Sequence, residues 1–204
     1  MNTDEIRITS RGDGMEEALA ATERLGLESG LGHKENLRLR LLAEELIGLM
    51  RGIAGSVEAD YQVGQKNKEF TLRLRADVNM SMELRRQLLA ASSSGKNAAA
   101  KGLMGRIRNM VAAFILMEKG DSTLPSGLSM GLMSMGSPSV YRSGDTYAWT
   151  LKRYMSEVSS SRERDEEAAE AWDELEKSIV ANLADDVSVR IEGRSAEIAI
   201  TKAF

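Results

Sequence analysis

Cysteine is absent from this chain of 204 residues, which excludes disulfides, thiolate zinc sites and a cysteine nucleophile. The single histidine, His33, excludes a histidine-rich metal site and most serine-hydrolase triads. Proline occurs only twice, and Ala, Leu, Met, Glu and Arg are abundant. Because these residues favour helices, we expect a largely helical chain, with strands where β-branched residues gather.

Long apolar runs and a basic excess are also missing. The chain has no run of about 18 apolar residues that could span a membrane. Charged residues interrupt the amino-terminal region, where a signal peptide would need an apolar core. The sequence therefore predicts a cytoplasmic protein that does not contact a membrane. With 27 basic and 31 acidic residues the net charge is −4. This balance argues against a nucleic-acid partner, since phosphate contact usually needs basic residues.

Helical periodicity is strongest over residues 36–53. Leu39, Leu42, Leu46 and Leu49 recur there every three or four residues and form one apolar stripe. Trp149 and Trp172 are expected to anchor the core elsewhere in the chain. The helices that we expect cover residues 15–25 (ended by Gly26), 36–53, 82–91, 98–117 and 162–183.

Alternating polar and apolar residues predict the strands. A polar turn between two such stretches, once near the middle and once near the end of the chain, predicts two hairpins. Because hairpins pair antiparallel and amphipathic helices need a sheet face to cover, we expect an α+β fold, a two-layer α/β sandwich in one domain of residues 1–204. A segment rich in Gly, Ser and Met, residues 120–145, is expected to be an insertion. The strands that we expect cover residues 5–9, 58–63, 69–76, 146–151, 187–191 and 198–200.

The first stretch with chemical potential runs from Leu41 to Met50. Glu45 and Leu49 lie one helical turn apart on it, and the stretch resembles the N-box helix of the histidine-kinase-like ATPases (GHKL or Bergerat-fold family). In that family a carboxylate on this helix activates water, and an Asn one turn later holds Mg²⁺. Glu45, or Glu44 in a shifted register, matches the carboxylate. Leu49 stands in place of the Asn and cannot ligate a hard cation, so no metal-binding residue is predicted.

A second stretch, Leu74 to Asn79, resembles the family's strand followed by an aspartate. In the family this Asp accepts a hydrogen bond from the adenine amino group, and a Gly follows closely. Asp77 matches the aspartate in position. Val78, Asn79 and Met80 stand where the Gly would be expected.

The third stretch joins a Ser-Gly-Lys-Asn loop to a Lys-Gly sequence before an expected helix. Glycine lets backbone N–H groups approach a phosphate, and a helix start favours an anion. The stretch is similar to the family's ATP lid and its Gly-x-Gly box. The residues that would contact phosphate are Lys96, Lys101, Gly102 and Gly105.

Through the order of its elements the resemblance covers residues 6–111, about half of the chain, and it gives a specific expectation. The resemblance implies a sandwich whose helices cover one face of a mixed, mainly antiparallel sheet. It also implies binding of ATP or ADP in a bacterial signalling role, with Glu45 as the base and Asp77 as the adenine reader. Because Leu49 removes the Mg²⁺ ligand, we expect binding without efficient turnover.

Simpler interpretations stay open beside this one. Glu44 and Glu45 are also consistent with solvated helix charges, Asp77 with a turn residue, and Gly102 and Gly105 with close helix packing. The alternative function is a non-catalytic module that kept the sandwich and binds a protein partner through residues 120–145. A kinase acting on a partner protein would need the missing Mg²⁺ site.

Overall fold

The computed structural model describes residues 1–51, 58–77, 102–108, 111, 140–143, 146–192 and 195–204. Its strands are β1 (Ile6–Thr9), β2 (Glu58–Lys66), β3 (Glu69–Asp77), β4 (Val140–Ser143), β5 (Thr146–Thr150), β6 (Asp186–Glu192) and β7 (Ser195–Ala203). Its labelled helices are α1 (Met15–Glu28), α2 (His33–Arg51), α6 (Leu151–Ser161), α7 (Glu166–Lys177) and α8 (Ile179–Leu183). None of the described helices is long and apolar enough to cross a membrane.

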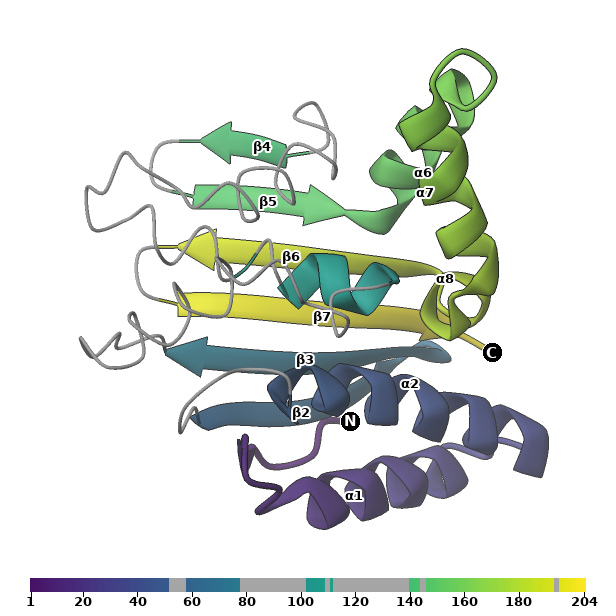
Figure 1. Cartoon of the computed structure of the whole chain (residues 1–204). Coiled ribbons are helices and arrows are strands. Elements are labelled where there is room, and N and C mark those ends of the chain that lie inside the picture. Colours follow the sequence, from purple (N-terminus) through teal and green to yellow (C-terminus); the bar gives the residue numbers. More distant parts are fainter. Residues whose placement is uncertain (52–57, 78–101, 109–110, 112–139, 144–145, 193–194) are drawn as a thin grey trace.

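The strands form one seven-stranded sheet in the order β1-β2-β3-β7-β6-β5-β4. The helices lie on one face of this sheet (Figure 1), so the predicted α+β fold, a two-layer sandwich, is confirmed. Each of the six pairings between described strands is antiparallel, where the family resemblance implied a mixed sheet. The two hairpins, β2–β3 and β6–β7, were both predicted, and β3 and β7 join them side by side at the centre.

Alternation along the strands produces the core. Side chains on the helix-covered face are buried, and those on the other face are half-buried or exposed, except at the small residues Gly64 and Ala199, which are buried. The turn between β2 and β3 has the geometry of a two-residue hairpin turn. Asn67 and Lys68 both have positive φ, at 50° and 64°, as such a turn requires. The large buried side chains of the central strands are Tyr61, Val63, Phe70, Leu72, Leu74, Val187, Val189, Ile191, Ile198 and Ile200.

Two helices cover the first half of the sheet. The α1 helix contacts β1, β2 and α2, and α2 contacts β3, β7 and α8. Between α1 and β2 lies a fully buried polar pair, in which the hydroxyls of Thr22 and Tyr61 are 2.7 Å apart. Burial raises the pKa of Tyr61, so its hydroxyl stays protonated as a hydrogen-bond partner.

The end of α1 differs from the prediction, because Gly26 does not stop the helix. The helix continues to Glu28, and Gly26 lies inside it against α2. A Cβ atom at Gly26 would stand 2.1 Å from Oδ1 of Asn36. The glycine therefore serves close packing of two helices, and α2 itself begins at His33, three residues before the predicted start.

The α6 helix was not predicted, since Leu151 was expected to end a strand. The strand β5 instead ends at Thr150, whose side chain caps α6 by accepting a hydrogen bond from the backbone N–H of Arg153 at 3.4 Å. The predicted helix over residues 162–183 is also wrong in two respects. Its first helical residue is Glu166, after the N-cap Asp165. It is divided into α7 and α8 at Ser178, whose hydroxyl accepts a hydrogen bond from the N–H of Ala181 at 3.2 Å.

Of the two tryptophans, Trp149 is buried as predicted, with 2% of its surface exposed. Trp172 lies half-buried at the core edge instead. Its indole N–H donates to Glu176 at 2.6 Å, and Arg162 lies 4.7 Å from its ring centre. Its polar ring nitrogen and this cation hold it at the surface, so the prediction of a core anchor was wrong there.

Other predicted elements fall partly outside the described residues. This applies to the whole helix expected over residues 82–91 and to most of the one expected over 98–117, of which residues 103–108 are helical. In the expected insertion, residues 120–139 and 144–145 also lie outside the described part. Residues 140–143 form β4, at the edge of the sheet.

Replacing either of two glycines with alanine tests the packing of α2, and the two substitutions should change stability in opposite directions. We expect Gly26→Ala to lower the free energy of unfolding by about 1–3 kcal/mol, because the added methyl group would overlap with Asn36. Gly48→Ala is the matched control. No atom lies within 4 Å of its Cβ position, so better helix propensity should raise stability by about 0.5–1 kcal/mol. Urea unfolding measures both, and equal effects would contradict this packing.

Asp185 predicts a dependence of stability on pH. Desolvation would raise its pKa, but hydrogen bonds from Nζ of Lys202 at 2.8 Å and from the N–H of Ala203 at 2.6 Å together hold the pKa below its ordinary value. A lowered folded-state pKa stabilises the fold above the unfolded-state pKa and loses that effect as pH falls through the folded value. Asp185→Asn should therefore destabilise at pH 7 and matter little at about pH 2.

Urea unfolding at both pH values measures this difference for Asp185→Asn. Asp173→Asn serves as the control, because Asp173 is exposed on α7. A destabilisation by Asp185→Asn that is the same at both pH values would contradict the role given to the ionised carboxylate.

Candidate functional site

The rotation of α2 decides what each predicted residue on it can do. Leu42 and Leu46 are fully buried, and Leu49 is 5% exposed within the same core. The side chain at the position of the family's metal-binding Asn therefore packs with apolar neighbours. Glu45 stands beside this stripe, half-buried.

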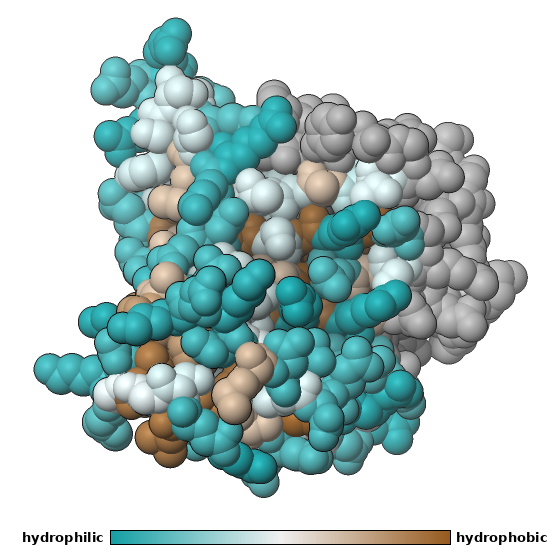
Figure 2. All heavy atoms as spheres, turned by 180° about the vertical axis from the view of Figure 1, so that it is seen from behind, coloured by the Kyte–Doolittle hydropathy of each residue, from teal (hydrophilic) through white to brown (hydrophobic). Residues whose placement is uncertain are grey.

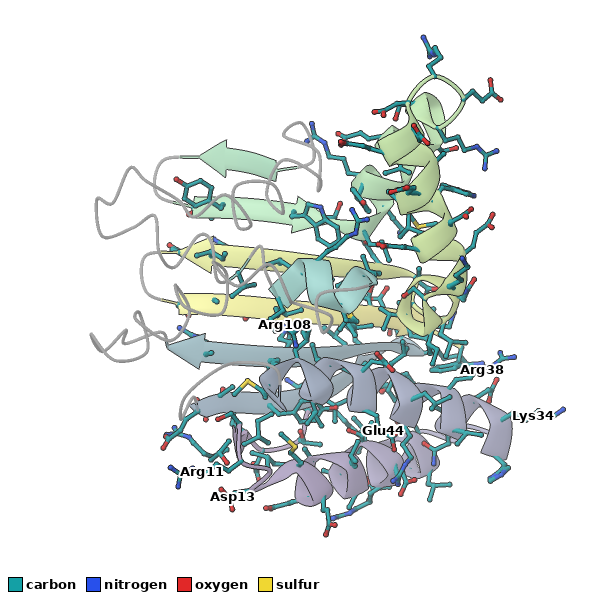
Figure 3. All side chains as sticks on the ribbon, viewed as in Figure 1. Arg11, Asp13, Lys34, Arg38, Glu44 and Arg108 are labelled. Carbon is teal, nitrogen blue, oxygen red and sulfur yellow. The ribbon has the colours of Figure 1, made fainter. Side chains whose placement is uncertain are left out.

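The two adjacent glutamates of α2 differ in their partners. Glu44 accepts a hydrogen bond from Nε of Arg40 at 2.9 Å, and Arg40 also reaches Glu23 of α1 at 2.6 Å. Figure 3 shows Glu44 on the α1 side of α2. Glu45 makes no hydrogen bond or ion pair within the described part of the chain. Of the two registers left open by the sequence, Glu45 is thus the carboxylate without a structural role there.

Asp77 is the last residue of β3, where its backbone pairs with Ser195 of β7; its side chain is not described. Because α2 contacts both β3 and β7, the helix with Glu45 and the strand with Asp77 are neighbours in the fold. The carboxyl ends of α2 and β3 lie toward the same edge of the sheet (Figure 1).

Of the four residues expected to contact phosphate, Lys96 and Lys101 lie outside the described residues. Gly102 has φ of +84°, and no atom lies within 4 Å of the position of a Cβ there. Its backbone conformation rather than close packing therefore favours glycine. Gly105 is buried in the helical turn of residues 103–108, which we call the glycine turn. Leu103 and Ile107 fix this turn in the core.

Arg106 binds the glycine turn to the second half of the fold. Its Nε donates to Glu174 of α7 at 2.6 Å, and a second nitrogen lies 3.4 Å from the hydroxyl of Tyr154 on α6. Desolvation acts to lower the pKa of Arg106, but the bond with Glu174 holds it above its ordinary value. The pKa of Tyr154 is raised by burial, so it stays neutral. The charge of Arg106 is therefore paired with Glu174.

Arg108 is a second cation on the glycine turn, which sequence reasoning did not single out. It is half-buried, and burial lowers its pKa, which means that the charge lies in a poorly solvated place. It extends from the turn toward α2 in the view of Figure 3. The sequence signal for Arg108 was its position three residues after Gly105 on an expected helix. This spacing did not show that Arg108, rather than Arg106, extends toward α2.

Glu45 and Asp77 thus belong to neighbouring elements, and the glycine turn lies in the same helical layer (Figure 1). No group of three or more His, Cys, Asp or Glu residues in the described ranges could hold a metal ion. Comparison with protein-family models, curated proteins and solved structures finds no significant match to this chain. The resemblance to histidine-kinase-like ATPases therefore stays a prediction that rests on its motifs.

The Arg106–Glu174 pair predicts a measurable link between the glycine turn and α7. We expect Arg106→Gln to lower the free energy of unfolding by about 1–2 kcal/mol, a range already reduced for the exposed part of the pair. Arg153→Gln is the control, because Arg153 is 51% exposed in its pair with Glu157, against 19% for Arg106, and its loss should cost below about 0.5 kcal/mol. A double-mutant cycle with Glu174→Gln measures the coupling, and additive effects would contradict the link.

Proposed function

We propose that this chain binds an adenine nucleotide, ATP or ADP, at a site made by α2, the end of β3 and the glycine turn. It would be a divergent histidine-kinase-like ATPase domain with a regulatory role in bacterial signalling. The observation that carries this proposal is that Glu45 is half-buried and has no partner among the described residues, whereas its neighbour Glu44 is paired with Arg40. A partly desolvated polar group without a partner costs free energy, and such groups gather at functional sites.

Two further features support the same site. Asp77 is the last residue of β3, a strand that contacts α2, and the family motif assigns to its carboxylate the hydrogen bond from an adenine amino group. Gly102 adopts a left-handed conformation ahead of a helical turn, which suits an approach of backbone N–H groups to phosphate. Arg108 adds positive charge to that turn. These groups would recognise the base and the phosphates separately.

The residues of this chain support hydrolysis of the nucleotide less well than they support its binding. Hydrolysis needs a metal ion or equivalent charge to neutralise the phosphates as water attacks. With Leu49 buried in the core, α2 supplies no oxygen ligand at that position. The residues do not fit Mg²⁺, so the proposed function is nucleotide binding with little hydrolysis.

Isothermal calorimetry with ADP and ATP, with Mg²⁺ and with EDTA, tests this function. We expect both nucleotides to bind with affinities that change little when Mg²⁺ is removed. Asp77→Ala should weaken binding at least tenfold because it removes the adenine contact. Glu45→Gln should keep binding, because the role proposed for Glu45 is that of a base, and its neighbour Glu44→Gln should also bind as wild type. Absence of heat from a folded wild-type chain would contradict the proposal.

The burial of Leu49 also favours the alternative, a non-catalytic module that kept the sandwich and binds a protein partner through residues 120–145. This alternative expects no nucleotide binding and a loss of partner when that segment is removed. A pull-down with and without residues 120–139, which leaves β4 in place, tests it. Unchanged partners after the deletion would count against this function.

A further inference from the structure

The sheet face opposite the described helices, which we call the open face, carries a row of alternating charge. Across five neighbouring strands the paired residues are Arg7, Asp60, Arg75, Glu197 and Arg190, in the order β1-β2-β3-β7-β6. Figure 2 shows this face, where hydrophilic side chains extend over most of the coloured surface. Positive and negative residues thus alternate strand by strand across the sheet.

Only the first part of this row is neutralised by ion pairs within it. Arg7 donates to Asp60 at 2.9 Å. The guanidinium of Arg75 donates to the hydroxyl of Ser195 at 3.1 Å, and Glu197 makes no hydrogen bond or ion pair among the described residues. The centre of the row therefore holds an arginine and a glutamate whose charges are available to a partner.

The alternation restricts what that partner can be. A partner with charge of one sign would meet repulsion at every second strand. A second copy of the same row, turned by 180° and displaced by one strand, meets an opposite charge at each position where the two rows overlap. Opposed potentials of this kind set the register and orientation of an interface.

We propose that two copies of this chain associate through their open sheet faces, about a two-fold axis that runs along the strands between β3 and β7. Arg75 then faces Glu197 of the second copy, and Asp60 faces Arg190 of the second copy. Symmetry repeats each pair, which gives four ion pairs across the interface. This axis lies near the middle of the seven strands, so it also gives extensive overlap of the two sheets.

The dimensions of the face suit this arrangement. Packed sheets lie about 10 Å apart, a gap that an Arg and a Glu side chain can bridge from opposite sides. Arg75 stands between two open hollows of the face. One, of about 420 Å³, is lined by Arg75, Arg190, Glu192, Ser195 and Glu197. The other, of about 210 Å³, lies toward β1 and β2. The ends of facing side chains could enter both.

One neighbouring row brings like charges together, since Glu58 faces Glu192 of the second copy. Each of these carboxylates already has an arginine of its own chain, Arg7 at 3.1 Å and Arg190 at 3.3 Å. On the other side of the charged row, Arg73 faces Ala199, which is small and uncharged. The first of these rows therefore adds a repulsion that the two arginines reduce, and the second adds none.

Sedimentation equilibrium of the full chain tests this dimer with a charge exchange. Wild type should show a monomer–dimer equilibrium that weakens when NaCl rises from about 0.05 to 0.5 M. Arg75→Glu and Glu197→Arg, each alone, should weaken the dimer at least tenfold, because each creates two like-charge contacts. An equal mixture of the two variants should dimerise again, since every contact in the mixed pair is then between opposite charges.

The mixture separates contacts between copies from contacts within one chain, because mixing cannot repair the latter. Arg38→Glu makes the same change of charge at an exposed residue of α2, and this control should dimerise as wild type. Asp60→Arg with Arg190→Glu provides an independent pair if one variant does not fold. A wild type that stays monomeric, single variants that dimerise normally, or a mixture that stays monomeric would each overturn the proposal.

Discussion

The packing of the apolar stripe of α2 against β3 and β7 is the interaction on which the rest of the structure depends. Leu39, Leu42 and Leu46 are fully buried there, and they fix the rotation of the helix about its own axis. Once that rotation is set, Leu49 must lie in the core and Glu45 must lie beside it. The packing that stabilises α2 therefore also determines that the helix offers a carboxylate but no oxygen ligand one turn later.

In the sheet, the alternation of side chains likewise fixes which residues lie in the core and which lie on the open face. Along β3, Leu72 and Leu74 enter the core while Arg73 and Arg75 point to the open face. A slip of one residue between β3 and β7 would bury the charges and expose the leucines, so the core itself fixes the register. The alternating charge row is consequently held in line across five strands by apolar contacts on the opposite face.

Local patterns were sufficient for the parts of the fold that depend on neighbours in sequence. The two hairpins and α2 follow from alternation and from leucine spacing. The sequence was less informative where distant residues decide. Gly26 stays inside α1 because Asn36 packs against it, and Thr150 turns an apparent strand into the start of α6. For the same reason the charge row was not predicted, since it requires β7 to lie between β3 and β6.

The candidate site shows the same division. Glu45 and Asp77 could be selected from their motifs, but the choice between Glu44 and Glu45 depended on Arg40 and its contact with α1. Similarly, the pairing of Arg106 within the chain depended on Glu174 and Tyr154, about 50 to 70 residues later in the chain. Charge and spacing name such candidates, whereas tertiary contacts assign their partners.

The most direct test of the central claim, that α2, the end of β3 and the glycine turn surround one nucleotide, is to follow backbone amide NMR signals during an ADP titration. The account predicts that the largest shifts occur at Glu45, Asp77 and Gly102, while Arg75 and Glu197 on the open face change little. Shifts confined to the open face, or no shifts at millimolar ADP, would contradict it.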